Sequence, residues 1–216
     1  MFSLVIILIL GYLAGSFPTA IILSKIIMKD DIRNYGSGNA GATNVFRIMG
    51  WKAALIVVAI DVGKGIIATL LIPKLVWQPL PFNVVTLQMV TGAVAIAGHV
   101  WTVFAGFRGG KGVGTAFGVL IALIPLSTLA VGIVWLILVF TTRIVSVGSL
   151  GAGILFPFAV VLQRAILDPN IPRSLLVMAF LVAFLIIITH RSNIRRLMKG
   201  EENRFGSRKN GIQEAE

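Results

Sequence analysis

Three short polar stretches, each rich in hydrogen-bond donors, interrupt a chain that is otherwise mostly apolar. They are residues 37–47 (SGNAGATNVFR), residues 106–112 (GFRGGKG) and residues 190–202 (HRSNIRRLMKGEE). Small residues let backbone amides converge on an oxyanion, and hydroxyl, amide and guanidinium side chains add directed donors. We therefore predict a single site for an anionic ligand, assembled from the three stretches at a membrane surface.

The first stretch carries the largest number of such groups. Its predicted contributors to an anion cradle are Ser37, Gly38, Asn39, Thr43, Asn44 and Arg47. The alternative interpretation is a turn-rich loop that caps two helices, in which Asn and Ser side chains bond their own backbone. So many donors and small residues within one short loop favour the anion cradle.

The second stretch resembles a nucleotide-binding P-loop only superficially. Its spacing is one residue short for that motif, and Gly112 stands where a Ser or Thr would hold Mg²⁺. The stretch could still bind an anion more weakly, because Gly109, Gly110 and Gly112 give the backbone the conformational freedom to direct its amides at a ligand. Lys111 adds a positive charge, and the following helix offers its N-terminus. The alternative is that Arg108 and Lys111 only set the orientation of the chain in the membrane.

The third stretch contains His190, Asn193 and Arg196 at positions i, i+3 and i+6. If the last helix continues beyond the membrane, these three side chains share roughly one of its faces. His190 is a candidate base or phosphate donor, and an ordinary interfacial histidine is the alternative. The other basic residues here are interpreted as anchors to lipid headgroups.

Three further polar residues lie within apolar stretches. Asp61 and Lys64 are three residues apart and so share one face of a helix. Charges at membrane depth are costly and usually paired, which predicts an ion pair facing the bundle, with substrate contact as the alternative. His99 is interpreted as a structural hydrogen-bonding residue, with a direct role at the site as the alternative.

The composition is that of an integral membrane protein. The 216 residues are 57% hydrophobic and only 12% charged, and their mean hydropathy is +0.95; soluble domains are closer to half apolar and a quarter charged. The absence of Cys excludes a disulfide, a thiolate zinc site and a cysteine nucleophile. With two His and eight scattered acidic residues, we predict neither a metal site nor a cofactor. The aromatic residues lie in apolar runs rather than among the basic patches, which argues against a nucleic-acid partner.

Apolar stretches predict spans at residues 1–27, 52–73, 84–105, 113–141, 146–162 and 174–189. The first shows neither a basic leader nor a convincing cleavage site, so we expect it to be uncleaved. Residues 113–141 are uncharged and contain Pro125; as one straight helix they would greatly exceed a hydrocarbon core of about 30 Å. We predict one membrane domain over residues 1–205 and a disordered polar tail in the cytoplasm over 206–216.

Charge decides how residues 113–141 cross. A single crossing would put the basic C-terminal tail on the side opposite the first two polar stretches, against the preference of Lys and Arg for cytoplasmic loops. A break at Pro125 instead places all three stretches together. We therefore predict an all-α bundle of seven transmembrane helices, with the N-terminus outside and the C-terminus in the cytoplasm. A re-entrant hairpin at Pro125 gives the same sidedness.

The three stretches together resemble a known family. SGNAGATNVFR, GHVWTVFAGFRGGKGVGT and HRSNIRRLMKGEE closely resemble, in this order, the three motifs of the bacterial membrane acylphosphate–glycerol-3-phosphate acyltransferases, the PlsY family. DVGKG at residues 61–65 is similar to that family too, and the resemblance covers essentially residues 1–205. It implies acyl transfer from acyl phosphate to the 1-hydroxyl of glycerol 3-phosphate, giving lysophosphatidic acid for phospholipid biosynthesis. It also implies seven helices in the bacterial cell membrane and a cytoplasmic active site.

Residue by residue, the resemblance implies that Ser37 and Arg47 bind glycerol 3-phosphate and that Lys111, His190 and Asn193 complete the site. The resemblance also implies that five glycines shape the loops: Gly38, Gly41, Gly109, Gly110 and Gly112. Residues that match motif letters without an assigned role are Asn39, Thr43, Asn44, Arg196 and Glu202. Of all these, His190, Ser37 and Lys111 are the expected catalytic residues.

Both implied substrates carry phosphate, so the site must hold two anions beside the carbonyl that is transferred. A His followed five residues later by Asp, known from another acyltransferase family, is missing, since Phe104 follows His99 and Arg195 follows His190 at that offset. Three routes stay open: His190 acts as the base, a substrate phosphate takes the proton, or Ser37 is acylated first. We favour direct transfer in a ternary complex, with Ser37 binding phosphate.

A transporter of a phosphorylated solute is the alternative function. It would need polar residues along a path through the spans, and Asp61 and Lys64 are almost the only candidates. Membrane lipid is an expected partner. The sequence leaves open the acyl chain preference, the use of acyl carrier thioesters and the oligomeric state, for which a monomer is the simplest case.

Overall fold

The computed structural model describes residues 1–204, and this part of the chain is built from helices. The predicted tail at 206–216 lies outside the described residues. The helices are α1 (Phe2–Ser16), α2 (Thr19–Ile27), η1 (Ile32–Asn34), α3 (Ala42–Met49), α4 (Trp51–Leu70), η2 (Ile72–Leu75), α5 (Val84–Val100), η3 (Val103–Ala105), α6 (Val113–Leu123), α7 (Pro125–Thr142), α8 (Val145–Ile166), α9 (Arg173–Thr189) and α10 (Arg191–Met198).

Five helical segments within residues 1–204 are long and apolar enough to cross a membrane. They are Phe2–Ile27, Trp51–Leu75, Val84–Ala105, Pro125–Thr142 and Val145–Ile166. α9 and α10 make a sixth if they count as one span, although they are bent by 60°. α6 has only 11 residues, about 17 Å of helix, so the count of seven stays a prediction.

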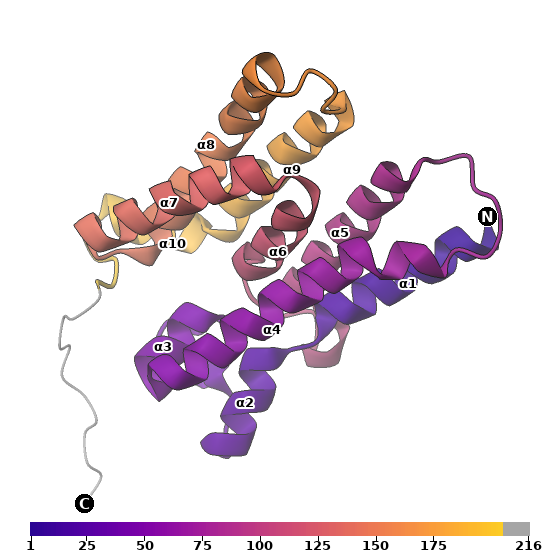
Figure 1. Ribbon diagram of the computed structural model, residues 1–216. Coiled ribbons are helices and arrows are strands. Elements are labelled where there is room, and N and C mark those ends of the chain that lie inside the picture. Colours follow the sequence, from indigo (N-terminus) through magenta and orange to yellow (C-terminus); the bar gives the residue numbers. More distant parts are fainter. Residues whose placement is uncertain (205–216) are drawn as a thin grey trace, which may run out of the picture.

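The break at Pro125 is confirmed. α6 ends at Leu123 and α7 begins at Pro125, the first position of the new helix. Proline is tolerated there because the first amides of a helix have no partner within it, whereas inside a helix its ring would clash with the preceding turn. Figure 1 shows α7 turning back from the end of α6.

Glycines let pairs of helices approach each other closely. A side chain on Gly15 in α1 would lie 2.0 Å from the Ala95 carbonyl oxygen in α5, and one on Gly98 would lie 2.3 Å from that of Tyr12. α4 and α6 meet in the same way through Gly65 and Gly118. In lipid, such close backbone contact is a main source of helix association. Gly15 of the first span thus serves close helix packing.

Large apolar side chains face outward over the bundle, above all on α7, α8 and α9. Phe140, Phe158 and Phe184 are each more than half exposed. A surface of this kind suits lipid and not water. Buried apolar residues of α5, α6, α8 and α9, among them Ile96, Val119, Val160 and Ala179, form the largest core cluster.

The first polar stretch is only partly the loop expected from its sequence, because Ala42–Met49 form α3. Val45 of this short helix is fully buried and lies in one apolar cluster with Ile32 and Val57. A helix this short is not stable alone, so its packing against α4 and η1 determines its conformation.

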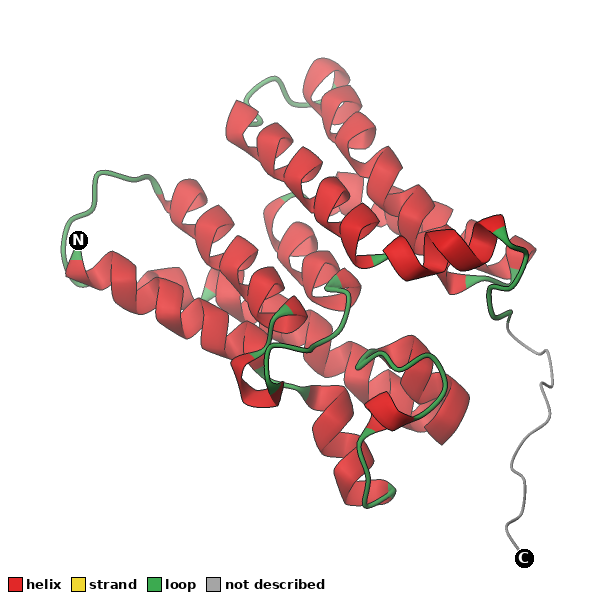
Figure 2. Cartoon of the chain, turned by 180° about the vertical axis from the view of Figure 1, so that it is seen from behind, coloured by secondary structure: helices red, strands yellow, loops and turns green. Residues whose placement is uncertain are grey.

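The three polar stretches lie toward one end of the bundle. The connections from α2 to α3 and from α5 to α6 and the bend between α9 and α10 lie toward this end (Figures 1 and 2). The connections from α4 to α5 and from α8 to α9 lie toward the opposite end, as does the N-terminus. The fold therefore brings distant parts of the chain together at one rim.

Candidate functional site

Asn44 organises the loop that opens the first stretch. Its Oδ1 accepts a hydrogen bond from the Ser37 backbone N–H at 2.9 Å. Its Nδ2 donates to the carbonyls of Ile32, at 3.2 Å, and Tyr35, at 3.0 Å. Both amide donors of this buried side chain are therefore used within the loop. Asn44 shapes this loop, and Ser37 and Arg47 line the cavity described below.

The glycines of the second stretch allow this loop to lie against the end of α5. The Gly109 N–H donates to the Val100 carbonyl at 3.0 Å, and the Gly110 N–H donates to the His99 carbonyl at 3.2 Å. A Cβ atom on Gly109 would lie 1.9 Å from the His99 carbonyl oxygen, a distance that no side chain tolerates. These two amides position the loop and are not aimed at a ligand.

Gly112 ends the loop in a left-handed conformation, with φ at 83°, directly before α6. Glycine adopts this conformation without the steric cost that other residues incur. Lys111 is thereby held between a fixed glycine loop and the start of a helix. Its backbone carbonyl also accepts a hydrogen bond from the Thr189 hydroxyl at 3.2 Å.

The third stretch reaches the other two through hydrogen bonds. The Lys111 ammonium donates to Asn193 Oδ1, and Arg47 Nη2 donates to the Asn203 carbonyl at 3.5 Å. Asn193 Nδ2 donates in turn to Glu202 Oε1 at 2.7 Å. The three stretches therefore meet: Lys111 contacts Asn193, Arg47 contacts the backbone of the residue that follows the third stretch, and residues of all three line one cavity.

His190 lies at the junction of α9 and α10 with only 3% of its surface exposed. Its Nδ1 lies 2.8 Å from the Ile186 carbonyl oxygen. Because a carbonyl can only accept, Nδ1 must carry the proton, and Nε2 of the neutral ring is then a hydrogen-bond acceptor. Burial and the nearby Lys111 lower the pKa of His190 to about 4, so the ring is neutral at pH 7 and suited to accept a hydrogen bond from a hydroxyl.

A cavity of about 680 Å³ connects these groups. The predicted site residues that line it are Ser37, Asn39, Gly41, Thr43, Asn44, Arg47, Lys111, Gly112, His190 and Asn193. The remaining predicted residues, Gly38, Gly109, Gly110 and Arg196, are not among its lining residues. Three of them are glycines that set loop geometry, and Arg196 donates a hydrogen bond to Glu202, which lines the cavity.

Most of the cavity is apolar and lies between helices. Its walls come from α4, α6, α7, α8 and α9, with Leu120, Trp135 and Phe156 among them. Ile133 and Leu136 of α7 line the cavity and are 58% and 46% exposed, so its apolar part is open and not enclosed. The polar part lies at the rim.

Glu202 was not among the residues predicted for the site, yet it connects two of them. It accepts from Asn193 and, at 2.7 Å, from Arg196 Nε, and its side chain is 2% exposed. Its match to a position of the family motif was the only indication in the sequence that it matters. An acidic residue in a basic stretch does not by itself suggest an anion site. Its role follows only from the fold, because it fixes the donors around it.

The predicted ion pair of Asp61 and Lys64 is confirmed, with Nζ and Oδ1 2.8 Å apart. Thr19 Oγ1 also donates to Asp61 Oδ1 at 3.2 Å, and Lys64 donates to the Phe17 carbonyl at 3.0 Å. His99 Nδ1 lies 3.6 Å from the same carboxylate oxygen. Asp61 and His99 both line the cavity, so this buried group forms part of its wall.

The electrostatics of the polar end favour an anion. The pKa of Lys111 is lowered to about 8, chiefly by burial; Glu202 opposes this shift, and the nearby Arg196 and Arg47 add to it. Burial likewise lowers the pKa of Arg47. An anion placed among these cations would stabilise their charged forms. Within residues 1–204 no three His, Asp or Glu side chains are grouped to hold a metal ion.

The affinity for a phosphate ester should therefore fall as the pH rises through 8. With a pKa of about 8, Lys111 is mostly protonated at pH 7 and mostly neutral at pH 9. The second phosphate pKa of about 6 leaves the ligand dianionic over this range. Calorimetric titration with glycerol 3-phosphate should show affinity falling by up to about tenfold per pH unit above 8. Lys111→Arg should remove this dependence, since arginine stays charged; a flat profile for the unaltered protein would contradict the assignment.

Comparisons with known proteins agree on one family. The sequence profile described as "Glycerol-3-phosphate acyltransferase" matches residues 5–200. A glycerol-3-phosphate acyltransferase of Chlorobium phaeobacteroides (strain BS1) is 42% identical, with 94% of this chain and 97% of the relative covered. One of Chlorobaculum tepidum is also 42% identical, with 97% and 100% covered.

Two solved structures have the same fold. One is a crystal structure of PlsY (YgiH), described as an integral membrane glycerol 3-phosphate acyltransferase, in the glycerol 3-phosphate form. It is 37% identical, with a TM-score of 0.83 over 94% of this chain and 96% of the other. The second is the lysophosphatidic acid form of that enzyme, 36% identical, with a TM-score of 0.79 and the same coverage.

Proposed function

Because the chain belongs to the glycerol-3-phosphate acyltransferase family, the PlsY family, and is an integral membrane acyltransferase acting on glycerol 3-phosphate, we propose that its acyl donor is an acyl phosphate. The products are then lysophosphatidic acid and inorganic phosphate. The observation that carries this proposal is the two-part cavity, whose polar end holds cations and whose larger part is apolar and lies between helices. An acyl phosphate has the same two parts, a charged head and a long apolar chain.

In this arrangement the donor's acyl chain lies between the helices and its phosphate lies at the rim. Ser37, Arg47, Lys111 and Asn193 bind the phosphate groups of the two substrates, since charged donors in a water-poor cavity bind oxyanions strongly. The glycerol 3-phosphate then has its 1-hydroxyl beside His190. Holding both substrates in one cavity replaces a bimolecular encounter by a positioned reaction.

The transfer itself needs little covalent help from the protein. The 1-hydroxyl oxygen bonds to the acyl carbonyl carbon, the bond from that carbon to the phosphate oxygen breaks, and phosphate leaves with the bonding electrons. The hydroxyl proton passes to His190 Nε2, which is free to accept because Nδ1 donates to Ile186. Lys111 and Arg47 stabilise the negative charge that develops on the carbonyl and phosphate oxygens.

We also propose that the site faces the cytoplasm of a bacterial cell and that α6 is the seventh span. The basic residues of α10 and of the first two stretches support this orientation, because Lys and Arg gather in cytoplasmic loops. By contrast, the connections at the opposite end carry only Lys74, Arg164 and Arg173 as basic residues. The short length of α6 is consistent with a span that begins below the membrane surface, because its first residue already lines the cavity.

One experiment tests both the donor and the sidedness. Inside-out and right-side-out membrane vesicles, from cells unable to take up glycerol 3-phosphate, receive labelled glycerol 3-phosphate and a synthetic acyl phosphate. We expect labelled lysophosphatidic acid and one equivalent of phosphate from inside-out vesicles, and from both preparations once detergent is added. Product formed only with an acyl carrier thioester would exclude the acyl phosphate donor. Product from intact right-side-out vesicles would exclude a cytoplasmic site, and absence of product from acyl phosphate in detergent would exclude this donor.

A further inference from the structure

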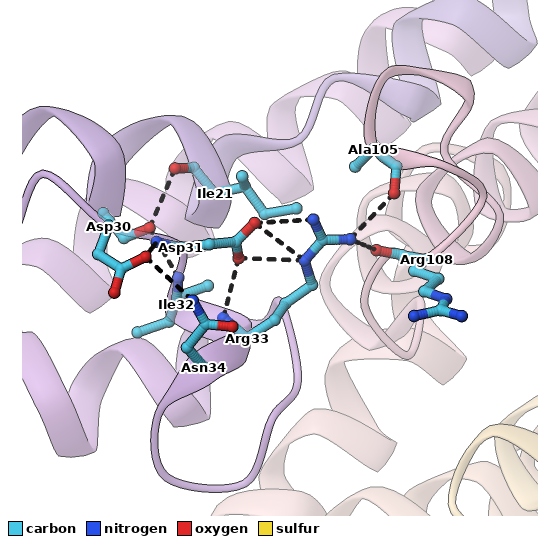
Figure 3. A network of polar contacts seen from close by, with 9 residues as sticks. Ile21, Asp30, Asp31, Ile32, Arg33, Asn34, Ala105 and Arg108 are labelled. Carbon is cyan, nitrogen blue, oxygen red and sulfur yellow. Dashed lines mark hydrogen bonds and ion pairs between the residues drawn. The ribbon is translucent and has the colours of Figure 1, made fainter.

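A cluster of charged residues between α2 and α3 lies outside the cavity but connects two of the polar stretches (Figure 3). Arg33 is at its centre. Its Nε lies 3.0 and 3.1 Å from the two carboxylate oxygens of Asp31, and its Nη2 lies 2.7 Å from Oδ2. This paired geometry fixes the plane of the guanidinium group.

The remaining end of the Arg33 side chain reaches a turn more than seventy residues away. Nη1 donates to the Ala105 carbonyl at 2.9 Å and to the Arg108 carbonyl at 3.1 Å. These two carbonyls are the ends of a four-residue turn, in which the Arg108 N–H also points to the Ala105 carbonyl at 3.4 Å. Figure 3 shows both carbonyls directed at Arg33, and the Arg108 side chain directed away from it.

The turn held by Arg33 has a conformation that needs external support. Phe107 has a positive φ of 59°, which is unfavourable for a residue other than glycine. Three residues beyond Arg108 the chain reaches Lys111, with Gly109 and Gly110 fixed between them on the end of α5. The position of Lys111 therefore depends on where this turn is held.

The other side of the cluster is anchored in the first stretch. Asp31 caps η1 by accepting from the Arg33 N–H at 2.9 Å. The neighbouring Ile32 is fully buried, and its carbonyl accepts from Asn44, the residue that holds the Ser37 loop. The hydrogen bonds of Arg33 keep the pKa of Asp31 below its ordinary value, so the pair stays charged at neutral pH.

We propose that Arg33, held by Asp31, is a positioning residue that sets Lys111 in register with the Ser37 loop for binding glycerol 3-phosphate. Arg33 is not among the residues lining the cavity, so its effect on binding passes through the Ala105–Arg108 turn. This inference rests on the proposed role of Lys111 in binding the phosphate group.

A double-mutant cycle on the binding of glycerol 3-phosphate tests the proposal. Calorimetry on the purified full chain in detergent compares Arg33→Gln, Lys111→Ala and the double variant with the unaltered protein. Arg33→Gln should weaken binding by about tenfold, the scale of one misplaced charged hydrogen bond. The double variant should bind no more weakly than Lys111→Ala alone, because two residues that act through one interaction are not additive.

Two further variants serve as controls. Arg33→Lys keeps the charge but lacks the planar fork that reaches Asp31 and both carbonyls, so it should weaken binding by an intermediate factor; it also replaces Arg33→Gln in the cycle if that variant does not fold. Arg108→Gln removes a charge from the same turn but keeps the carbonyl that Arg33 binds, so it should bind like the unaltered protein.

The outcomes separate this proposal from the one on which it rests. Normal binding by the Arg33 variants alongside weakened binding by Lys111→Ala would overturn the positioning role, as would effects that multiply in the double variant. Normal binding by Lys111→Ala would overturn the proposed site, and the positioning role with it. Weakened, non-additive binding without product from acyl phosphate would exclude that donor and leave the role of Arg33 intact.

Discussion

Lys111→Ala should lower kcat/KM for glycerol 3-phosphate by about 100-fold, the scale of one or two charge-assisted hydrogen bonds lost in a buried site. Lys111 lies at the polar end of the cavity and its ammonium is bonded to Asn193. Its removal leaves Arg47 as the main cation of the rim. Steady-state kinetics with both substrates varied would measure the effect.

The division of this loss between KM and kcat identifies what Lys111 binds. A rise in the KM for glycerol 3-phosphate with kcat unchanged would mean that the ammonium binds the ground-state phosphate. A fall in kcat would mean that it acts on the charge that develops during transfer. Lys52→Ala is the matched control, because Lys52 is exposed, lies against Trp51 and does not line the cavity. Equal activities for the two variants would exclude Lys111 from the site.

His190→Ala should lower kcat by about 100-fold, the lower range for loss of a general base. The hydrogen bond from Nδ1 to the Ile186 carbonyl leaves Nε2 as the acceptor in the cavity. The only other histidine, His99, lies beside Asp61 and is not held by a carbonyl of α9 as His190 is. Turnover at saturating concentrations of both substrates is the quantity to measure.

His190→Gln separates orientation from proton transfer. Its amide oxygen can accept a hydrogen bond from the glycerol hydroxyl but is far too weak a base to take the proton. Loss of activity in both variants therefore favours a base, whereas activity restored by glutamine favours orientation. Substantial turnover by His190→Ala would show that the substrate phosphate takes the proton instead.

The polar rim is organised by residues whose types give little hint of that role. Glu202 accepts from Asn193 and Arg196, and Asn44 uses its whole amide to hold the Ser37 loop. An anion site with fixed donors loses less entropy on binding than one that must order itself. Glu202 lines the cavity, and its two hydrogen bonds fix the side chains of Asn193 and Arg196 beside it.

Much of this protein followed from its sequence alone. Composition and long apolar runs are enough to identify a membrane protein, because lipid requires helices of a certain length. Pro125 marks a helix boundary through its own covalent structure. The pairing of Asp61 with Lys64 follows from the cost of an isolated charge at membrane depth. The three ordered motifs were specific enough to indicate the family.

The tertiary structure decided which of the donors are available. By type, Asn44, Gly109 and Gly110 looked as suitable for an anion as Ser37 or Lys111, yet their donors are used within the protein. Whether a hydrogen-bond donor is free depends on groups that the fold brings within about 3 Å, and those groups lie far away in the chain. The link from Arg33 to the Ala105–Arg108 turn is of the same kind, since no local pattern specifies a contact between side chain and backbone across seventy residues.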